Sequence, residues 1–386
     1  MKPQSALWTS VFAGLALSLA LPGCGGSASS TDGCGNNCPP PAPAEFLYAT
    51  SNADNSLAVF KVNMSTGALG TPTTQNAPTS TVGILATHSA KFLYVSDLFG
   101  DSIDAFSIDA ASGAISPVPG SPFSLGPFPP HYLAGGLATD PSGRFLFVTE
   151  ITNWGVATFT INGQTGSLTQ TATSPVASDG RAPIALAVHP SGKFLYVANM
   201  FDANISGFAI DVGGNLAELS TSPFSVMGGP NPGNIVTHPN GKFLYMILRG
   251  DNSSLSYVHG SVIGDDGSLT DIPGSPFLTG RIPYGIRLDP AAHTLYTANF
   301  GDGTISAFSV DPNSGALSSV AGSPFPAGAN PYDIVIDPSG KFLYSSDDNQ
   351  NVILSFTIGV GGAITPFGQP IPTVPQTAWL AIAHVP

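Results

Sequence analysis

A short phrase that recurs along most of the chain limits what this sequence can fold into. An aromatic residue or Thr, then Leu, then a second aromatic residue follow one another at intervals of 46 to 53 residues. The copies begin at Phe46, Phe92, Phe145, Phe194, Phe243, Thr294 and Phe342. A period near 50 residues is typical of a repeat array, and units that each hold several short strands predict a β-propeller rather than a helical solenoid.

Each unit predicts four strands, a to d, joined by tight turns. In one unit the apolar stretch 331–336 is followed by the turn Asp-Pro-Ser-Gly at 337–340 and by the apolar stretch 341–345. Because Pro presets the bend and Gly tolerates positive φ, the two stretches can pair as antiparallel strands a and b. One aromatic residue per unit marks strand c, and a Gly-x-aliphatic start followed by Ser-Pro-Phe marks strand d. Only 9% of the residues are charged, while 45 are Gly and 36 are Pro. This composition excludes a coiled coil or a helical bundle.

The order of the expected strands predicts how the ring closes. Seven strands a are expected, beginning at Val82, Ala134, Pro183, Pro232, Pro283, Pro331 and Ala378. The last of them, 378–383, has no strand b after it, and the first strand b, at Phe46, has no strand a before it. Pairing these two ends leaves no open sheet edge. We therefore expect an all-β, seven-bladed propeller of four-stranded blades over residues 45–386.

The first 44 residues predict an export signal and a tether. Lys2 precedes the apolar run 6–21, which has the length of a secretory signal core. The run ends in Leu-Pro-Gly-Cys at 21–24, which resembles a bacterial lipoprotein signal; the resemblance implies cleavage before Cys24 and lipidation of its thiol. Residues 1–23 are then a signal peptide, and residues 24–44, rich in Gly, Ser and Pro, are a flexible tether. Secretion with a free Cys24 is the alternative.

The expected location follows from the same segment. Residue 25 is Gly rather than Asp, which in lipoproteins leans toward the outer membrane. We therefore expect an exported chain that is lipid-anchored to the cell envelope, on the outer membrane or its periplasmic side, and that touches the membrane only through the anchor. Cys34 and Cys38 are not spaced as Cys-x-x-Cys, and the rest of the chain lacks cysteine, so disulfides do not hold the fold.

The net charge argues against nucleic acid as a partner, and the positions of the histidines argue against a metal site. The net charge of −13 argues against nucleic acid, which needs a basic surface. The histidines that end strand a are replaced by Asp in other units, so this position predicts a turn residue rather than a metal ligand. The residues at this position are His88, His189, His238, His384, Asp140, Asp289 and Asp337. We expect no metal, no cofactor and a monomeric chain.

The repeat itself resembles a known family. Lys-Phe-Leu-Tyr-Val-Ala-Asn at 193–199, together with the Pro-Ser-Gly turns, resembles the YVTN-repeat, seven-bladed lactonase propellers similar to 6-phosphogluconolactonase. Trp379, in the closing strand, sits where that family has a Trp. The resemblance covers roughly residues 45–386, and it implies the propeller fold and a lactone (carboxylic ester) hydrolase activity.

Arginine and aromatic residues break the repeat on one face. Strands a and b are antiparallel, so the start of strand a and the end of strand b share a face. Arg181 and Arg281 each precede a strand a by two residues, Arg249 follows a strand b, and Arg287 lies inside a strand a. Equivalent positions near the start of strand a hold aromatic residues in three units and small or aliphatic ones in four: Tyr284, Tyr332 and Trp379 against Gly83, Gly135, Ile184 and Gly233.

These residues predict a pocket at the centre of the ring. An aromatic wall with arginines suits an anionic or sugar-like ligand. The alternative is that the arginines pair with carboxylates of the rim and that the aromatic rings pack against each other. The carboxylates considered for this pairing are Glu150, Asp97, Asp347 and Asp348.

The resemblance leaves catalysis open. The family places Arg-His and Asn-Glu pairs on the fifth unit, where this chain has Gly233-Asn234 and Leu248-Arg249, and only Asn299 matches the pattern. Lactone opening without a carboxylate or imidazole lacks a general base. Glu150, at the end of the third strand b, could substitute as the catalytic residue. Two functions remain: a non-catalytic propeller that binds a small anionic or carbohydrate-like ligand or a protein partner, and a lactone hydrolase that uses Glu150 and the arginines.

Overall fold

The computed structural model describes residues 42–77, 81–126, 134–226, 231–251 and 254–386. The predicted signal peptide, Cys24 and almost all of the tether lie outside these residues. Residues 41–386 form one compact unit, whose described elements are all strands. In the part of the chain that is described, no helix has the length and apolarity that a membrane span requires.

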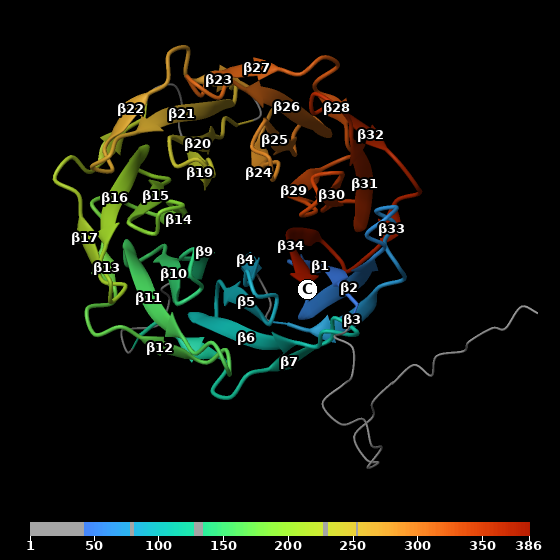
Figure 1. Cartoon of the computed structure of the whole chain (residues 1–386), viewed down its shortest axis with the longest axis horizontal. Coiled ribbons are helices and arrows are strands. Elements are labelled where there is room, and N and C mark those ends of the chain that lie inside the picture. Colours follow the sequence, from blue (N-terminus) through green and yellow to red (C-terminus); the bar gives the residue numbers. More distant parts are fainter. Residues whose placement is uncertain (1–41, 78–80, 127–133, 227–230, 252–253) are drawn as a thin grey trace, which may run out of the picture. The chain divides into compact units, whose positions relative to one another are not determined.

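The described residues form seven antiparallel sheets arranged around a central axis, with strand a innermost in each (Figure 1). We number the sheets as blades 1 to 7, beginning with the blade that contains both ends of the unit. The innermost strands, in blade order, are β34 (Thr377–Val385), β4 (Thr81–Ala86), β9 (Ala134–Thr139), β14 (Pro183–Val188), β19 (Pro232–Thr237), β24 (Pro283–Leu288) and β29 (Pro331–Ile336).

Strands b and c follow outward in each blade. The strands b are β1 (Ala44–Ser51), β5 (Phe92–Asp97), β10 (Phe145–Glu150), β15 (Phe194–Asn199), β20 (Phe243–Leu248), β25 (Thr294–Asn299) and β30 (Phe342–Asp347). The strands c are β2 (Ser56–Val62), β6 (Ser102–Ile108), β11 (Gly155–Ile161), β16 (Asn204–Ile210), β21 (Tyr257–Ile263), β26 (Thr304–Val310) and β31 (Val352–Ile358).

The outermost strand differs from the expectation of one strand d. Blade 1 has a single strand, β3 (Thr73–Asn76), but in the other blades two short strands both pair with strand c. The first pieces are β7 (Ile115–Pro117), β12 (Leu168–Gln170), β17 (Leu216–Glu218), β22 (Leu269–Asp271), β27 (Leu317–Ser319) and β32 (Ile364–Pro366). The second pieces are β8 (Phe123–Ser124), β13 (Val176–Ala177), β18 (Phe224–Ser225), β23 (Phe277–Leu278), β28 (Phe325–Pro326) and β33 (Ile371–Pro372).

In blades 2 to 6 a Ser-Pro phrase stands at this interruption, whereas blade 7 is interrupted without one. In blade 2 the Ser121–Pro122 peptide bond is cis, and the Ser121 hydroxyl accepts a hydrogen bond of 2.9 Å from the Ala105 N–H of strand c. A side-chain oxygen therefore takes the place of a strand carbonyl at this point, and the chain leaves the sheet between the two pieces. Blades 3 to 6 repeat the same cis Ser-Pro bond.

The ring closes as the sequence predicts. Strand β34 pairs antiparallel with β1, from Ala44 opposite Val385 to Ser51 opposite Thr377. The C-terminal strand thus supplies strand a of blade 1, so that no blade lacks its innermost strand. The seven-bladed, all-β fold is confirmed.

Hydrophobic side chains pack between neighbouring blades, in what we call the seams. In the seam between blades 1 and 2, Phe46 and Tyr48 pack with Leu93 and Val95. The buried Tyr48 hydroxyl donates to the Gly113 carbonyl of blade 2 at 2.9 Å. Five more tyrosines repeat this bond to a glycine carbonyl of the next blade: Tyr94, Tyr196, Tyr245, Tyr296 and Tyr344. Blade 3 has Phe147 at this position and therefore has no hydroxyl to donate.

Candidate functional site

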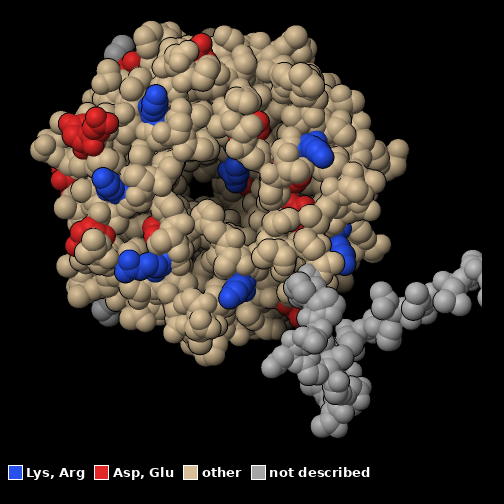
Figure 2. Space-filling model, viewed as in Figure 1, with Lys and Arg blue, Asp and Glu red and all other residues tan. Residues whose placement is uncertain are grey.

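The starts of the strands a and the ends of the strands b share one face, as expected. Pro183 lies opposite Asn199 in blade 4, and Pro283 lies opposite Asn299 in blade 6. We call this the mouth face. Residues from the middle of the innermost strands surround a cavity of about 290 Å³. Figure 2 looks down the ring and shows the opening at its centre.

The cavity wall is polar on one side only. Blades 2 to 4 contribute glycine and aliphatic residues: Val82, Gly83, Ile84, Leu85, Gly136, Leu137, Ala185 and Leu186. Blades 5, 6, 7 and 1 contribute every polar side chain of the wall: Asn234, Arg287, Asp333 and Trp379. The asymmetry that the sequence shows in strand a therefore becomes an asymmetry of the cavity.

An aromatic row leads outward from the cavity. The Trp379 ring meets the Tyr332 ring edge-on at 5.1 Å between centroids, and Tyr332 stacks on Tyr284 at 4.5 Å and 12°. Phe300 packs edge-on against Tyr284 at 5.4 Å. The Trp379 indole N–H donates to the Thr81 carbonyl at 3.0 Å, which fixes the ring. Three of these residues are the predicted ones, and the structure brings them together.

Arg249 completes this row. Its guanidinium carbon lies 4.6 Å from the centre of the Tyr284 ring, in the geometry of a cation–π contact. The residue is half-buried, and its N–H donates to the Asn231 carbonyl at 3.0 Å. Burial raises the pKa of Tyr332, so its hydroxyl stays protonated and can donate a hydrogen bond. The row therefore offers a cation, aromatic faces and a hydroxyl on one side of the mouth.

Arg287 lies in the cavity wall and is paired. Its Nη2 lies 3.1 Å from Oδ2 of Asp333, and its Nη1 donates to the Ile286 carbonyl at 2.9 Å. Asp333 Oδ2 also accepts the Leu380 N–H at 3.1 Å. Burial raises the pKa of Asp333, while Arg287 lowers it. The buried Asp333 carboxylate requires a counter-charge, which Arg287 supplies. Asp333 is not among the carboxylates that the sequence indicated as partners.

Arg181 and Arg281 do not line the cavity. The Arg181 Nη2 lies 2.7 Å from Asp202 Oδ1, and the Arg281 Nε lies 2.6 Å from Asp302 Oδ1. Both guanidinium groups are about half exposed. Each arginine lies two residues before strand a, next to the b–c loop of its own blade. It therefore pairs with the aspartate of that loop. The arginines therefore do pair with carboxylates, which was the alternative to a ligand pocket. Their partners are Asp202, Asp302 and Asp333 rather than the carboxylates named from the sequence.

Comparison with known proteins identifies the family. The model of the family described as Lactonase, 7-bladed beta-propeller matches residues 42–122, 72–177 and 129–325. The chain belongs to this lactonase family. A search of the curated proteins gave no match.

Solved structures share the fold of this lactonase-family chain at low sequence identity. A putative 6-phosphogluconolactonase from Bacteroides uniformis is 21% identical with a TM-score of 0.73, over 88% of this chain and 99% of that one. A second, from Bacteroides fragilis, is 21% identical with a TM-score of 0.74, over 88% and 98%. A periplasmic gluconolactonase from Pseudomonas aeruginosa is 17% identical with a TM-score of 0.71, over 89% and 100%.

Glu150, the candidate base for a lactonase reaction, does not line the cavity. It ends β10 and is 1% exposed, and its Oε2 accepts the Asn153 side-chain N–H at 3.0 Å within its own loop. Burial raises its pKa, while the Asn153 bond lowers it. The equivalent residue of blade 6, Asn299, donates to the Ser306 hydroxyl at 2.8 Å. This position therefore bonds within its own blade, which is a structural role.

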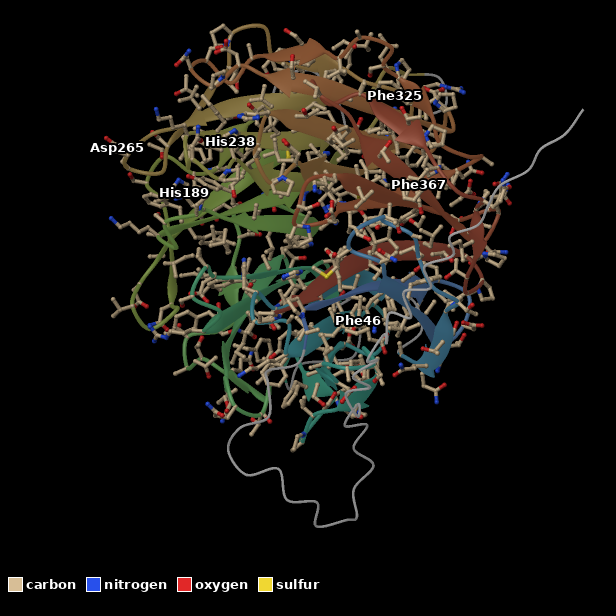
Figure 3. All side chains as sticks on the ribbon, turned by 45° about the vertical axis from the view of Figure 1, so that its right-hand side comes forward. Phe46, His189, His238, Asp265, Phe325 and Phe367 are labelled. Atoms are coloured by element: carbon tan, nitrogen blue, oxygen red, sulfur yellow. The ribbon has the colours of Figure 1, made fainter. Side chains whose placement is uncertain are left out.

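Two of the histidines that end strands a bond to the turn of the next blade. The His189 Nε2 lies 2.8 Å from the Gly241 carbonyl of the next blade, and the His238 Nε2 lies 3.0 Å from the Ala292 carbonyl. Figure 3 labels both side chains, which lie in neighbouring blades. Within the described ranges, no three His, Cys, Asp or Glu residues are grouped so that they could hold a metal ion.

Three residues at the mouth were not selected from the sequence as ligand-binding. Asn234 lines the cavity and donates to the Tyr284 carbonyl at 2.8 Å. Phe300 joins the aromatic row, and Asp348 interacts electrostatically with Tyr332. Burial and the neighbouring Asp347 raise the pKa of Asp348. Phe300 and Asp348 both directly follow a strand b, as Arg249 does. Comparing this position across the seven repeats could therefore have indicated them from the sequence.

Proposed function

We propose that this lactonase-family propeller binds a small anionic or sugar-like ligand at the mouth. The observation that carries the proposal is how the Arg249 guanidinium is paired. Among the described residues no carboxylate pairs with its guanidinium, whereas Arg181, Arg281 and Arg287 each have one. A half-buried guanidinium on an aromatic face suits a planar carboxylate or a phosphate.

The surroundings of Arg249 support a compact polar ligand. The aromatic row offers faces on which the apolar side of a sugar ring can pack, and the Tyr332 hydroxyl adds a hydrogen-bond donor. The cavity volume of about 290 Å³ is near the lower limit of small-molecule sites. A monosaccharide acid meets both conditions.

Calorimetric titration with D-gluconate tests this proposal. The ring, residues 41–386, should bind gluconate saturably, and Arg249→Ala should weaken binding roughly tenfold or more, since hydrogen bonds to charged groups contribute about 1.5–3 kcal/mol. Arg181→Ala is the matched control, because its guanidinium is exposed and paired with Asp202; its affinity should equal that of the wild type. No saturable binding, or equal losses in both variants, would contradict the proposal.

We further propose that the chain is exported and anchored through Cys24, with residues 1–23 removed and residues 24–44 as the tether. The Leu-Pro-Gly-Cys ending of an apolar run supports this address. Mass spectrometry of the N-terminal peptide should find acyl chains on Cys24, and Cys24→Ala should leave the protein unlipidated. An unmodified Cys24 on a processed chain would instead indicate plain secretion.

A second function, lactone hydrolysis, is favoured by one fact, the membership in the lactonase family. The Pseudomonas aeruginosa relative is named a periplasmic gluconolactonase, and an exported chain would meet such a lactone outside the cytoplasm. A general base works best when its pKa lies near the working pH. Both Glu150 and Asp348 have a raised pKa, but only Asp348 lies beside the aromatic row.

Turnover of D-glucono-δ-lactone, measured above its rate in buffer, separates these possibilities. Loss of turnover in Asp348→Asn alone would place the base at the mouth, whereas loss in Glu150→Gln alone would support Glu150. Turnover equal to the buffer rate, together with saturable gluconate binding, would leave the propeller as a binding protein.

A further inference from the structure

Apolar side chains are exposed on one part of the mouth face. They belong to the b–c loops of blades 2, 3 and 4, which directly follow β5, β10 and β15. Phe99 is 66% exposed, Phe201 64% and Trp154 47%. We call the following set the apolar arc: Leu98, Phe99, Ile151, Trp154, Met200 and Phe201. Side chains of this size rarely remain exposed together without a role.

The arc belongs to three neighbouring blades, although Leu255 in the b–c loop of blade 5 is also 60% exposed. The two residues that follow strand b are Asn52 and Ala53 in blade 1, Arg249 and Gly250 in blade 5, and Asp348 and Asn349 in blade 7. Outside blades 2 to 4, only Phe300 of blade 6 is a large apolar residue at this position, and it is occupied by packing against Tyr284.

The arc continues the apolar wall of the cavity. Blades 2 to 4 also supply the glycine and aliphatic part of that wall, while every polar lining side chain comes from the other blades. Ile151 of the arc reaches the innermost strand of its blade, since its Cγ1 lies 3.3 Å from the place that a Cβ on Gly135 would occupy. The apolar part of the cavity wall and the apolar arc therefore come from the same three blades, whereas Arg249 and the aromatic row belong to blades 5, 6, 7 and 1.

We propose that the ligand of the mouth is amphiphilic, with an anionic head on the Arg249–Trp379 side and an unbranched acyl or alkyl chain over the apolar arc. This inference rests on the proposed binding function. A cavity of about 290 Å³ can hold a head group but not a long chain as well. The chain must therefore leave the cavity, and the apolar wall that blades 2 to 4 supply favours an exit towards the arc of the same blades. A protein partner on the arc would not require an apolar wall inside the cavity.

A series of carboxylates of rising chain length tests this inference. The ring is titrated in a calorimeter with butyrate, hexanoate, octanoate and decanoate, below the concentrations at which they aggregate, and with D-gluconate as the reference. Each added methylene that reaches the arc should lower the Kd about two- to fourfold, the factor expected for burial of one methylene.

Paired substitutions assign the chain to the arc. Phe99→Ser with Phe201→Ser should abolish the dependence on chain length and leave gluconate binding unchanged. Both side chains are largely exposed, so the variant should fold. The matched control is Val212→Ser with Val360→Ser, since these valines are 91% and 107% exposed and follow strands c on other loops. This control should keep the wild-type dependence.

The outcomes separate the inference from the function on which it rests. A Kd that does not change with chain length, with gluconate still bound, would overturn the inference and leave the binding function intact; the arc would then serve a protein partner. Dependence on chain length that persists in the Phe99→Ser, Phe201→Ser variant would also overturn it. If neither gluconate nor any carboxylate binds, the proposed function and the inference fail together.

Discussion

The seams and the mouth are built from the same repeat. The seams keep nearly the same residues in every blade, whereas the residues at the mouth differ between blades. In the seams, six of seven blades use a tyrosine hydroxyl to bond the next blade, and Tyr344 carries the pattern across the ring closure to Gly67. At the mouth, equivalent positions hold Gly or Ile in four blades and aromatic residues in three. The seams are uniform, whereas the mouth is one-sided.

This difference separates residues that hold the fold from residues that are free to serve a ligand. A position that must join each blade to the next admits the same residue everywhere, because every seam has the same geometry. A position that faces the central opening is not constrained in this way. The presence of aromatic residues on just one side of the opening therefore needs another explanation. Substitutions in the seams should therefore change stability, and substitutions at the mouth should change binding.

The largest effect is expected at a seam glycine. Gly113 has a φ of +73°, and a Cβ there would lie 2.4 Å from Phe46 Cδ1. Gly113→Ala should lower the free energy of unfolding by about 2–4 kcal/mol, because the ring must move and the backbone conformation is unfavourable. Gly143→Ala is the control, since Gly143 has a φ of +69° but nothing within 4 Å; it should cost only about 1 kcal/mol. Urea unfolding gives both values, and equal losses would break the comparison.

Part of the pH dependence of stability should come from the strands that close the ring. Glu45 of β1 is 2% exposed and lies opposite His384, and burial, followed by the charge of Asp337, raises its pKa to about 7. Because this value exceeds the unfolded value of 4.5, the folded state binds the proton more tightly. The resulting stability is present below pH 4.5 and is lost as the pH rises through 7.

Glu45→Gln should remove this contribution, about 3 kcal/mol between pH 4.5 and 8. Thermal unfolding of both proteins across that range measures it. The wild type should lose stability relative to Glu45→Gln as the pH rises. Parallel curves would show that Glu45 does not titrate in this window.

The tyrosine bonds predict a smaller, reciprocal pair of effects. Tyr48→Phe leaves the Gly113 carbonyl without its donor and should cost about 1–2 kcal/mol. Phe147→Tyr restores the seam hydroxyl where blade 3 lacks it and should stabilise by up to about 1 kcal/mol. Urea midpoints of the two variants should shift in opposite directions. A destabilising Phe147→Tyr would show that the seam of blade 3 differs in more than one atom.

The smallest effect on stability is expected at the mouth. Arg249→Ala removes one cation–π contact of 4.6 Å and should cost less than about 1 kcal/mol of unfolding free energy. The same variant is the one expected to lose ligand affinity. If its urea midpoint fell as far as that of Gly113→Ala, Arg249 would belong to the fold and the contrast between seams and mouth would fail.

Most of the fold could be predicted because it depends on local patterns that repeat. The Phe-Leu-Tyr strand, the Pro-Ser-Gly turn and the unmatched ends at Phe46 and residues 378–383 together specify seven blades and their closure. The two pieces of strand d were missed. In blades 2 to 6 the interruption coincides with a serine hydroxyl, such as that of Ser121, that accepts a hydrogen bond from the neighbouring strand. Such a bond leaves no trace in hydrophobic periodicity.

The candidate site could be predicted only in part. The aromatic row was predictable, since Tyr284, Tyr332 and Trp379 occupy one position of the repeat and neighbouring innermost strands bring them together. The partners of the arginines were not, because Asp333 and Asp202 meet Arg287 and Arg181 through pairings between blades or across a loop. Glu150 showed how a polar residue on the right face can be turned away from the cavity by a bond within its own loop.

A crystal structure of the ring grown with D-gluconate tests the account most directly. We predict ligand density against the Arg249 guanidinium and along the row from Tyr284 to Trp379, at the edge of the cavity. Density for the ligand at another part of the surface, with this side of the mouth holding only solvent, would contradict the claim that the one-sided mouth is the binding site.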